Sequence, residues 1–137
     1  LVGPNDVALR IAENVRKEHD NFGLLVDLSH IPLLGQTPEE ALVPVKDYLV
    51  HVHIGNAVVG DPSHPAYGDA HPRFGIEGGV NDVEELADFL KVLFDIGYLG
   101  EGEPKIVSFE VKPLPGESSE LVIANAKRTL NEAWARL

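Results

Sequence analysis

Hydrophobic positions along the chain follow two alternating patterns: apolar residues three or four apart, and short continuous apolar runs. The helical spacing predicts helices over about residues 6–20, 38–48, 82–96 and 119–137. The continuous runs predict strands over residues 23–28, 49–54 and 105–111. A segment of 25 residues, 55–79, separates the second strand from the third helix and contains three prolines and six glycines. Loops of this length are often functional.

Capping and breaking residues support the predicted helix ends. Residues able to cap a helix precede each one: Asn5, Thr37, Asn81 with Glu84 in a capping box, and Ser118 or Ser119. Pro44 is expected to break or kink the second helix before it ends near Tyr48. The expected inward positions are Val7, Ile11, Ala12 and Val15; Val83, Leu86, Ala87, Leu90, Leu93 and Phe94; and Leu121, Ala124, Leu130 and Trp134 or their near neighbours.

The alternation of helices and strands predicts an α/β fold with parallel strands and right-handed crossovers. Nearly continuous apolar strands are typical of a parallel sheet that helices cover on both faces. Three strands are too few to close a barrel, so we expect residues 1–137 to form part of a sheet completed elsewhere. An open three-stranded α/β domain is the alternative.

Composition is ordinary for a globular protein, with 44% hydrophobic and 24% charged residues. No apolar run approaches the roughly 20 residues of a membrane span, and no segment has the pattern of a signal peptide. We therefore expect a cytoplasmic protein without a membrane partner. The chain contains no Met, and we expect it to be part of a longer protein.

Charge and cysteine content narrow the function further. The net charge of −11, from 22 acidic and 11 basic residues, disfavours extended contact with nucleic acid. The chain has no Cys, so a metal ion must be bound by imidazole and carboxylate groups. Such ligands suit Mn, Mg, Zn, Fe or Co.

Each predicted strand ends in polar residues. Asp27 and His30 follow the first strand, His53 and Asn56 close the second, and Glu110 closes the third. The carboxyl ends of parallel strands are where active sites of α/β folds lie. Taken singly, these residues are more often helix caps, hydrogen-bonded structural residues or partners of a lysine such as Lys105 or Lys112. Taken together, they favour metal ligation by Asp27, His53 and Glu110.

The two histidines of the second strand are expected to point to the same face, because they are two residues apart. His53 is nearer the carboxyl end and is the better ligand. His51 is expected to lie behind or beneath it.

The long loop offers further candidate ligands. Asp69 and His71 are two residues apart and could share a metal ion or a substrate hydroxyl. Arg73 could grip a phosphate or carboxylate through two hydrogen bonds. The alternative is a loop fixed by its own aspartate hydrogen bonds and prolines.

The ordered set of Asp27-x-x-His30, His51-x-His53-x-Gly55 and a strand ending in Glu110 resembles the xylose-isomerase-like barrel superfamily. That superfamily includes sugar phosphate isomerases and epimerases, ketose 3-epimerases and the endonuclease IV type of apurinic-site nuclease. The resemblance implies a (β/α)8 TIM barrel, of which this chain would supply the sixth to eighth strands with their flanking helices.

The same resemblance implies roles for individual residues. Asp27, His53 and Glu110 match metal ligands, and Glu110 would also act as a catalytic acid or base. His30 matches a substrate-contacting histidine of the epimerases or a ligand of an additional zinc in the nucleases. Asp69 and His71 match the Asp-x-His pair that binds this additional zinc. A fourth ligand of the superfamily, a Glu, would lie before Leu1, and Val59 stands where the epimerases carry an Arg.

Three functions follow from these expectations. The first is a metal-dependent sugar or sugar-phosphate isomerase or epimerase, which acts through an enediolate and has His30, Asn56 and Arg73 as substrate contacts. The second is metal-dependent hydrolysis of a phosphodiester, with His30, Asp69 and His71 on a further ion. The third is a fragment or relative without activity of its own. The expected partner is a small sugar, and a homo-oligomer is compatible with the sequence.

Overall fold

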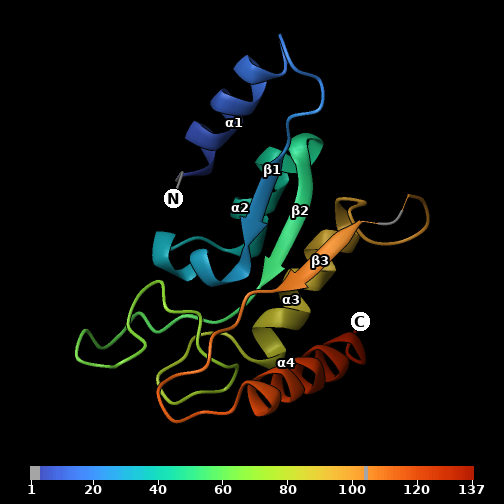
Figure 1. Cartoon of the computed structure of the whole chain (residues 1–137). Helices are drawn as coiled ribbons and strands as arrows, with labels where there is room; N and C mark the ends of the chain where they lie inside the picture. Colours follow the sequence, from blue (N-terminus) through green and yellow to red (C-terminus); the bar gives the residue numbers. More distant parts are fainter. Residues whose placement is uncertain (1–3, 104) are drawn as a thin grey trace.

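Three parallel strands form an open sheet in the order β1–β2–β3 (Figure 1). The structure, a computed structural model, describes residues 4–103 and 105–137. The strands are β1 (Leu24–Asp27), β2 (Leu49–Ile54) and β3 (Ile106–Phe109). β1 is two residues and β3 three residues shorter than the apolar run that predicts it, whereas β2 matches its run. The predicted mixed α/β architecture with parallel strands is confirmed.

The helices alternate with these strands as expected. They are α1 (Asn5–Val15), η1 (Leu28–His30), η2 (Pro32–Leu34), α2 (Pro38–Leu42), η3 (Val43–Tyr48), α3 (Val83–Asp95) and α4 (Ser119–Trp134), where η marks a 3-10 helix. The α-helix α2 gives way to the 3-10 helix η3 just before Pro44, as predicted, because a proline interrupts the α-helical hydrogen bonds. Thr37 caps α2 as expected, and together with Glu40 it forms a capping box.

Side chains on the sheet form rows that alternate between its two faces. Val26, Val52 and Val107 are in register across the three strands and belong to the side packed against helices. Asp27, His53 and Ser108 are in register one residue later and therefore point to the other face. The sheet thus has one apolar face and one face that carries polar and imidazole groups.

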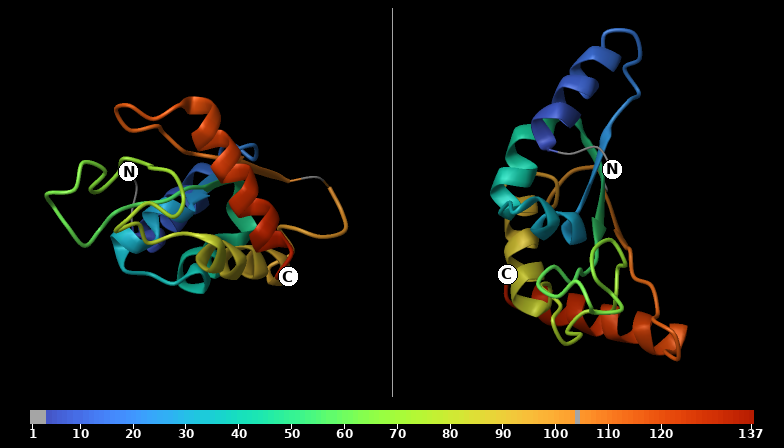
Figure 2. Two further views of the ribbon diagram at one scale, coloured as in Figure 1. Left: turned by 90° about the horizontal axis from the view of Figure 1, so that it is seen from below. Right: turned by 90° about the vertical axis from the view of Figure 1, so that its left-hand side faces the viewer.

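The hydrophobic core lies between the apolar face and the helices α2 and α3 (Figure 2, right). Val52 and Ile54 of the central strand are almost completely buried there, against Leu86 and Leu90 of α3. The last helix, α4, packs against α3 rather than crossing the polar face, and it begins below the carboxyl ends of the strands. The core therefore fixes one side of the sheet and leaves the other side free.

The polar face is uncovered, which corrects the expectation of a sheet covered on both faces. Leu25 is 47% exposed and Ile106 is 57% exposed, although both lie within strands. Within the described residues no helix covers this face (Figure 2, right), and both β1 and β3 are edge strands. The nearly continuous apolar strands predict cover on both faces. The sequence of a strand does not show, however, which segments of the chain pack against it.

Several helix details differ from the predictions. The first helix ends at Val15, not Asp20, and Asn5 is its first residue; its amide donates to the Ala41 carbonyl oxygen at 2.5 Å instead of capping. The third helix is capped by Asp82, one residue later than predicted, and Glu85 accepts a hydrogen bond from the Asp82 N–H at 3.0 Å. Asn81 is buried and serves another purpose, described below.

The inward stripes of three helices also differ from expectation. Those of α4 are Val122, Ala126, Thr129 and Ala133, whereas Leu121 is 71% exposed and Trp134 is 51% exposed. Val7 and Ile11 of α1 and Phe94 of α3 are likewise exposed. Among these exposed side chains, Phe94 and Trp134 pack against each other, with 5.5 Å between their ring centroids. None of the described helices has the length and apolar character needed to cross a bilayer.

Candidate metal centre

Parallel pairing brings three predicted ligands to one edge of the sheet. Asp27 at the end of β1 pairs in register with His53 near the end of β2. Glu110 directly follows β3, and its N–H donates to the Ile54 carbonyl oxygen at 3.0 Å, which continues the alignment beyond the strand. One ligand atom from each of Asp27, His53 and Glu110 lies within 4.8 Å of the others. The predicted convergence of these side chains is therefore present.

The imidazole of His53 lies between the two carboxyl groups. Its Nδ1 is hydrogen-bonded to Oε2 of Glu110 and lies 3.5 Å from Oδ2 of Asp27. The His53 side chain is 25% exposed and that of Glu110 40%, so the group is open on one side. Two carboxyl groups and an imidazole nitrogen are oxygen and nitrogen donors of the type that hold divalent ions in proteins.

Asp27 is only 4% exposed, so its carboxyl group needs hydrogen-bond or ionic partners within the protein. Its Oδ1 accepts hydrogen bonds from the Ser29 N–H and hydroxyl, but its Oδ2 is buried and has no hydrogen-bond partner among the described residues. Burial raises the pKa of Asp27, and its contact with Glu110 raises it further. A buried carboxylate oxygen without a partner is costly, and a cation at this position would remove that cost.

The pKa of Glu110 moves in the opposite direction. The neighbouring Asp27 carboxyl group lowers it first, and the hydrogen bond with His53 lowers it further. Opposite shifts of this kind are expected of two adjacent carboxyl groups, because ionisation of one disfavours ionisation of the other. Such a pair can bind a cation when both groups are ionised.

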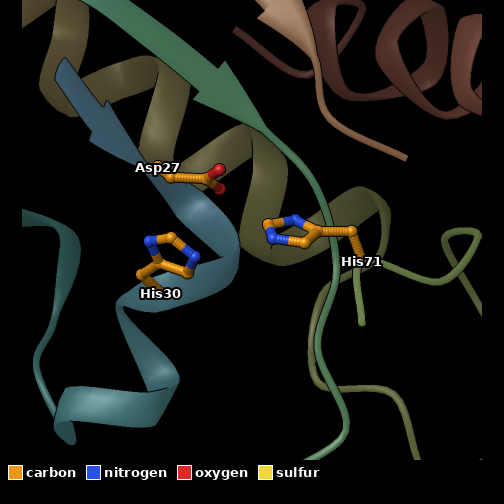
Figure 3. A group of neighbouring side chains, drawn as sticks. All are labelled: Asp27, His30 and His71. Atoms are coloured by element: carbon orange, nitrogen blue, oxygen red, sulfur yellow. The ribbon is translucent and has the colours of Figure 1, made fainter. Parts of the chain in front are cut away.

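A second group of potential ligands shares Asp27 with the first. Asp27, His30 and His71 also offer ligand atoms within 4.8 Å of one another. Figure 3 shows their three side chains converging from the end of β1, from the 3-10 helix η1 and from the loop after β2. The rings of His30 and His71 lie edge to face, with 5.3 Å between their centroids.

Asp69 bridges the two histidines of this second group. Its Oδ1 lies 2.8 Å from Nε2 of His30 and 2.8 Å from Nε2 of His71. The hydrogen bond with His30, followed by that with His71, lowers the pKa of Asp69. The expectation that Asp69 and His71 act together therefore agrees with their positions, and His30 joins them.

The loop holds His71 in an unusual backbone conformation. Its φ of 50° is the only positive φ of a non-glycine residue in the described ranges, a conformation that costs free energy for most side chains. The Lys112 N–H donates to the His71 carbonyl oxygen at 2.7 Å, which ties this residue to the segment following Glu110. The fold thus fixes His71 relative to both groups of ligands.

His51 lies behind the first group, as predicted. Its Nε2 is hydrogen-bonded to the Ser108 hydroxyl at 2.7 Å, and its ring packs edge to face on His53 at 5.0 Å. It does not contribute to either group of ligand atoms. His51 therefore packs against the His53 ring from a position two residues earlier on the same face of β2.

Asn56 requires a correction, because it is fully buried and is not placed to contact a substrate. Its Nδ2 donates to the Arg73 carbonyl oxygen at 3.0 Å, and its Oδ1 accepts from the Ala57 and Asn81 N–H groups at 2.8 Å each. Asn81 in turn donates through its side chain to the Gly55 carbonyl oxygen at 3.0 Å. The side-chain amides of Asn56 and Asn81 thus hold the long loop against the end of β2.

Arg73 lies apart from both groups of ligands. Its Nε donates to Oε1 of Glu117 at 2.9 Å, at the turn before α4, and it lines a cavity with residues 116–118, 121 and 122. The sequence placed Arg73 correctly on the loop but gave no means of knowing its partner. A role in gripping a substrate is not supported by this position.

The sequence reasoning overlooked two residues that organise the centre, Ser29 and Gly55. Ser29 is 1% exposed and contacts both Asp27 and His71, as developed below. A Cβ on Gly55 would lie 2.5 Å from the Glu110 carbonyl oxygen, so only glycine permits this close approach of the two chains. Their positions in the sequence could have pointed to them, because Ser29 lies between Asp27 and His30 and Gly55 follows His53 by two residues.

The described residues do not enclose a pocket for a sugar at the centre. The cavity that reaches Asp27 and His30, along β1, holds about 60 Å³, the volume of about two waters. A larger substrate would have to approach from the uncovered face of the sheet, where the His53 and Glu110 side chains are partly exposed.

Comparisons of the chain with protein-family models, with curated proteins and with solved structures gave no match. The chain is therefore assigned to no family, and its function is argued from the geometry of the centre.

Proposed function

We propose that this chain forms the metal-binding part of a divalent-metal-dependent isomerase or epimerase that acts on a sugar or sugar phosphate. In this proposal the three strands correspond to strands six to eight of a (β/α)8 barrel, and the uncovered face of the sheet is the barrel interior. Active sites of such barrels lie at the carboxyl ends of the strands, where Asp27, His53 and Glu110 converge.

The observation that carries the proposal is the buried Oδ2 of Asp27, which has no hydrogen-bond partner among the described residues and lies 3.5 Å from Nδ1 of His53. Structural aspartates at strand ends normally use both oxygens as hydrogen-bond acceptors, because an unpaired buried oxygen costs about 1–3 kcal/mol. Two carboxyl groups and one imidazole around this oxygen fit a hard or borderline divalent ion. Asp27, His53 and Glu110 would hold it.

A divalent ion bound there would polarise adjacent oxygens of a ketose and stabilise the negative charge of an enediolate. Glu110 is the most exposed of the three ligands and is the residue able to move a proton at the reacting carbon. In this proposal His30, which lies close to Asp27 in the second group, would hold a substrate hydroxyl. The small-molecule substrate is consistent with the acidic chain, which would repel a polyanion.

Metal analysis tests this function. The chain is dialysed against Mn²⁺, Co²⁺ or Zn²⁺ and then against metal-free buffer, and bound metal is counted by mass spectrometry. One equivalent that is lost in Glu110→Gln supports the proposal, and a chain that retains no metal contradicts it. Activity is then measured as incorporation of solvent deuterium into ketoses and ketose phosphates, because transfer of a proton to the reacting carbon leaves this label.

We expect the 137-residue chain alone to show no such incorporation. Its described residues supply one carboxylate near the open face, whereas inversion at carbon needs a proton acceptor and a proton donor on opposite sides. Incorporation should appear when a further strand supplies a second carboxylate. Rapid incorporation by the chain alone would contradict this division of roles.

The cluster of His30, Asp69 and His71 favours a second candidate, the metal-dependent hydrolysis of a phosphodiester. These three side chains meet around Oδ1 of Asp69, next to the first group. Two or more metal equivalents per chain, with loss of one in His71→Ala, would favour hydrolysis over isomerisation. The net charge of −11 weighs against a nucleic-acid substrate for this chemistry.

A further inference from the structure

The hydroxyl of Ser29 connects the two groups of candidate ligands. Ser29 lies in the 3-10 helix η1, two residues after Asp27, and is 1% exposed. Its N–H and its O–H both donate to Oδ1 of Asp27, at 2.7 and 2.5 Å. Because both donors use Oδ1, the carboxyl group is oriented with Oδ2 towards His53, 3.5 Å away. Ser29 therefore decides which oxygen of Asp27 is left for a cation.

The same hydroxyl also determines the hydrogen-bonding state of His71. Ser29 Oγ lies 3.0 Å from Nδ1 of His71. A serine hydroxyl has a single hydrogen, and here it is directed to Asp27, so Oγ accepts from His71 and Nδ1 carries the proton. The opposite assignment would place a proton on Oδ1 of Asp27, which already accepts the Ser29 N–H.

With Nδ1 donating to Ser29, His71 directs Nε2 to the candidate metal positions, where a bound cation would replace the hydrogen that Nε2 donates to Asp69. Nε2 lies 2.8 Å from Oδ1 of Asp69 and 3.7 Å from Oε1 of Glu110. In metal sites of proteins, the ring nitrogen that does not bind the ion usually donates to a neighbouring acceptor, which fixes the tautomer and the orientation of the ring. Ser29 occupies the place of that acceptor.

We propose that Ser29 is a positioning residue of the metal centre, whose hydroxyl directs Asp27 Oδ2 and His71 Nε2 towards bound divalent cations. This inference rests on the proposed function, because it presupposes that the centre binds metal. It goes further in naming a buried side chain outside both groups that is hydrogen-bonded to Asp27, which they share, and to His71 of the second group. Loss of a residue that orients metal ligands typically lowers metal affinity about 10–100-fold.

The long loop contains a matched control for this arrangement. Asp61 and Ser63 repeat the local pattern, since the Ser63 N–H and O–H both donate to Oδ1 of Asp61, at 2.9 and 2.7 Å. This pair is exposed, and the Ser63 hydroxyl has no hydrogen bond with a histidine in the described part of the chain. Ser63→Ala therefore removes the same local hydrogen bond as Ser29→Ala without affecting either group of ligands.

The test uses the full 137-residue chain and titrations with Zn²⁺ and Co²⁺. Ser29→Ala should bind both ions about 10–100-fold more weakly and change the visible absorption of the Co²⁺ form. Ser63→Ala should bind within about twofold of wild type, and Ser29→Thr, which restores the hydroxyl, should recover most of the affinity. Nitrogen NMR of the imidazoles should show His71 protonated at Nδ1 in the wild-type chain with Zn²⁺ and a changed tautomer in Ser29→Ala.

The outcomes separate the inference from the proposed function. Wild-type affinity and an unchanged Co²⁺ spectrum in a folded Ser29→Ala variant would overturn the inference alone. A wild-type chain that binds neither ion would overturn the proposed function and this inference with it. If Ser29→Ala does not fold, the NMR of the zinc-bound wild-type chain decides, because a His71 that carries its proton on Nε2 rather than on Nδ1 in that form contradicts the assigned role of Ser29.

Discussion

Oδ2 of Asp27 and Nδ1 of His53 lie 3.5 Å apart on neighbouring parallel strands that pair these two residues in register. The distance is too long for a hydrogen bond and suits two atoms that share a third partner. His51, two residues earlier on the same strand, is directed to the Ser108 hydroxyl instead. The two histidines therefore allow a direct test of the centre.

His53→Ala should abolish binding of a divalent ion, because it removes the nitrogen between the two carboxyl groups. His51→Ala should change the affinity less than about tenfold, since it only supports the neighbouring ring. Isothermal titration with Zn²⁺ or Mn²⁺ measures both. Equal losses in the two variants would show that His53 is not the ligand.

Asp27→Asn should stabilise the metal-free chain at pH 7. The pKa of Asp27 is raised from its usual value of 3.8 by burial and by Glu110, so the folded state keeps this proton when the unfolded chain has lost it. The resulting stabilisation is complete below pH 3.8 and is lost as the pH rises through the folded pKa. Asparagine mimics the neutral form at every pH, so the free energy of unfolding should rise at pH 7.

Urea denaturation with a chelator present, at pH 7 and below pH 3.8, measures this effect. The difference between Asp27→Asn and wild type should shrink at the lower pH, where wild-type Asp27 is neutral in both states. Added Zn²⁺ should stabilise wild type but not the variant, because the anionic ligand is missing. A variant less stable than wild type at pH 7 without metal would contradict the account of Asp27.

Gly55→Ala should disturb the centre through the backbone. The new methyl group would lie 2.5 Å from the Glu110 carbonyl oxygen and would push the end of β3 away. We expect a loss of about 1–3 kcal/mol in the free energy of unfolding, together with weaker metal binding. Gly60→Ala is the matched control, since its Cβ meets nothing within 4 Å and its stability should change by less than about 0.5 kcal/mol. Similar effects of the two substitutions would rule out the close approach as the cause.

Asn56→Ala should loosen the loop that carries Asp69 and His71. It would leave the Asn81 N–H and the Arg73 carbonyl oxygen without their buried partner, at a cost of about 2–4 kcal/mol. The exposed Asn14, which accepts only from Lys17, provides a control in which alanine should cost less than about 0.5 kcal/mol. Thermal denaturation and proteolysis within residues 55–79 measure both variants, and an uncleaved Asn56→Ala loop would count against this anchoring role.

The order of helices and strands, the parallel α/β class and the convergence of Asp27, His53 and Glu110 could all be predicted from the sequence. They follow from local periodicity and from the rule that carboxyl ends of parallel strands meet at one edge. The Thr37 cap and the break before Pro44 were also predictable, because both depend on residues adjacent in sequence. Closure into a barrel is not visible in the described residues and stays part of the proposal.

Only the tertiary structure shows which residues that are distant in sequence contact one another. Sequence alone did not show that Asn56 is buried in the loop, that Arg73 pairs with Glu117, or that Ser29 links Asp27 to His71 across 42 residues. Nor did it show that one face of the sheet lacks cover. Periodicity and capping depend on neighbours within a few residues, whereas burial and hydrogen bonding depend on which segments the whole fold brings together. The sequence therefore determined the elements and the types of ligand, and the tertiary structure determined which atoms each side chain presents to the centre.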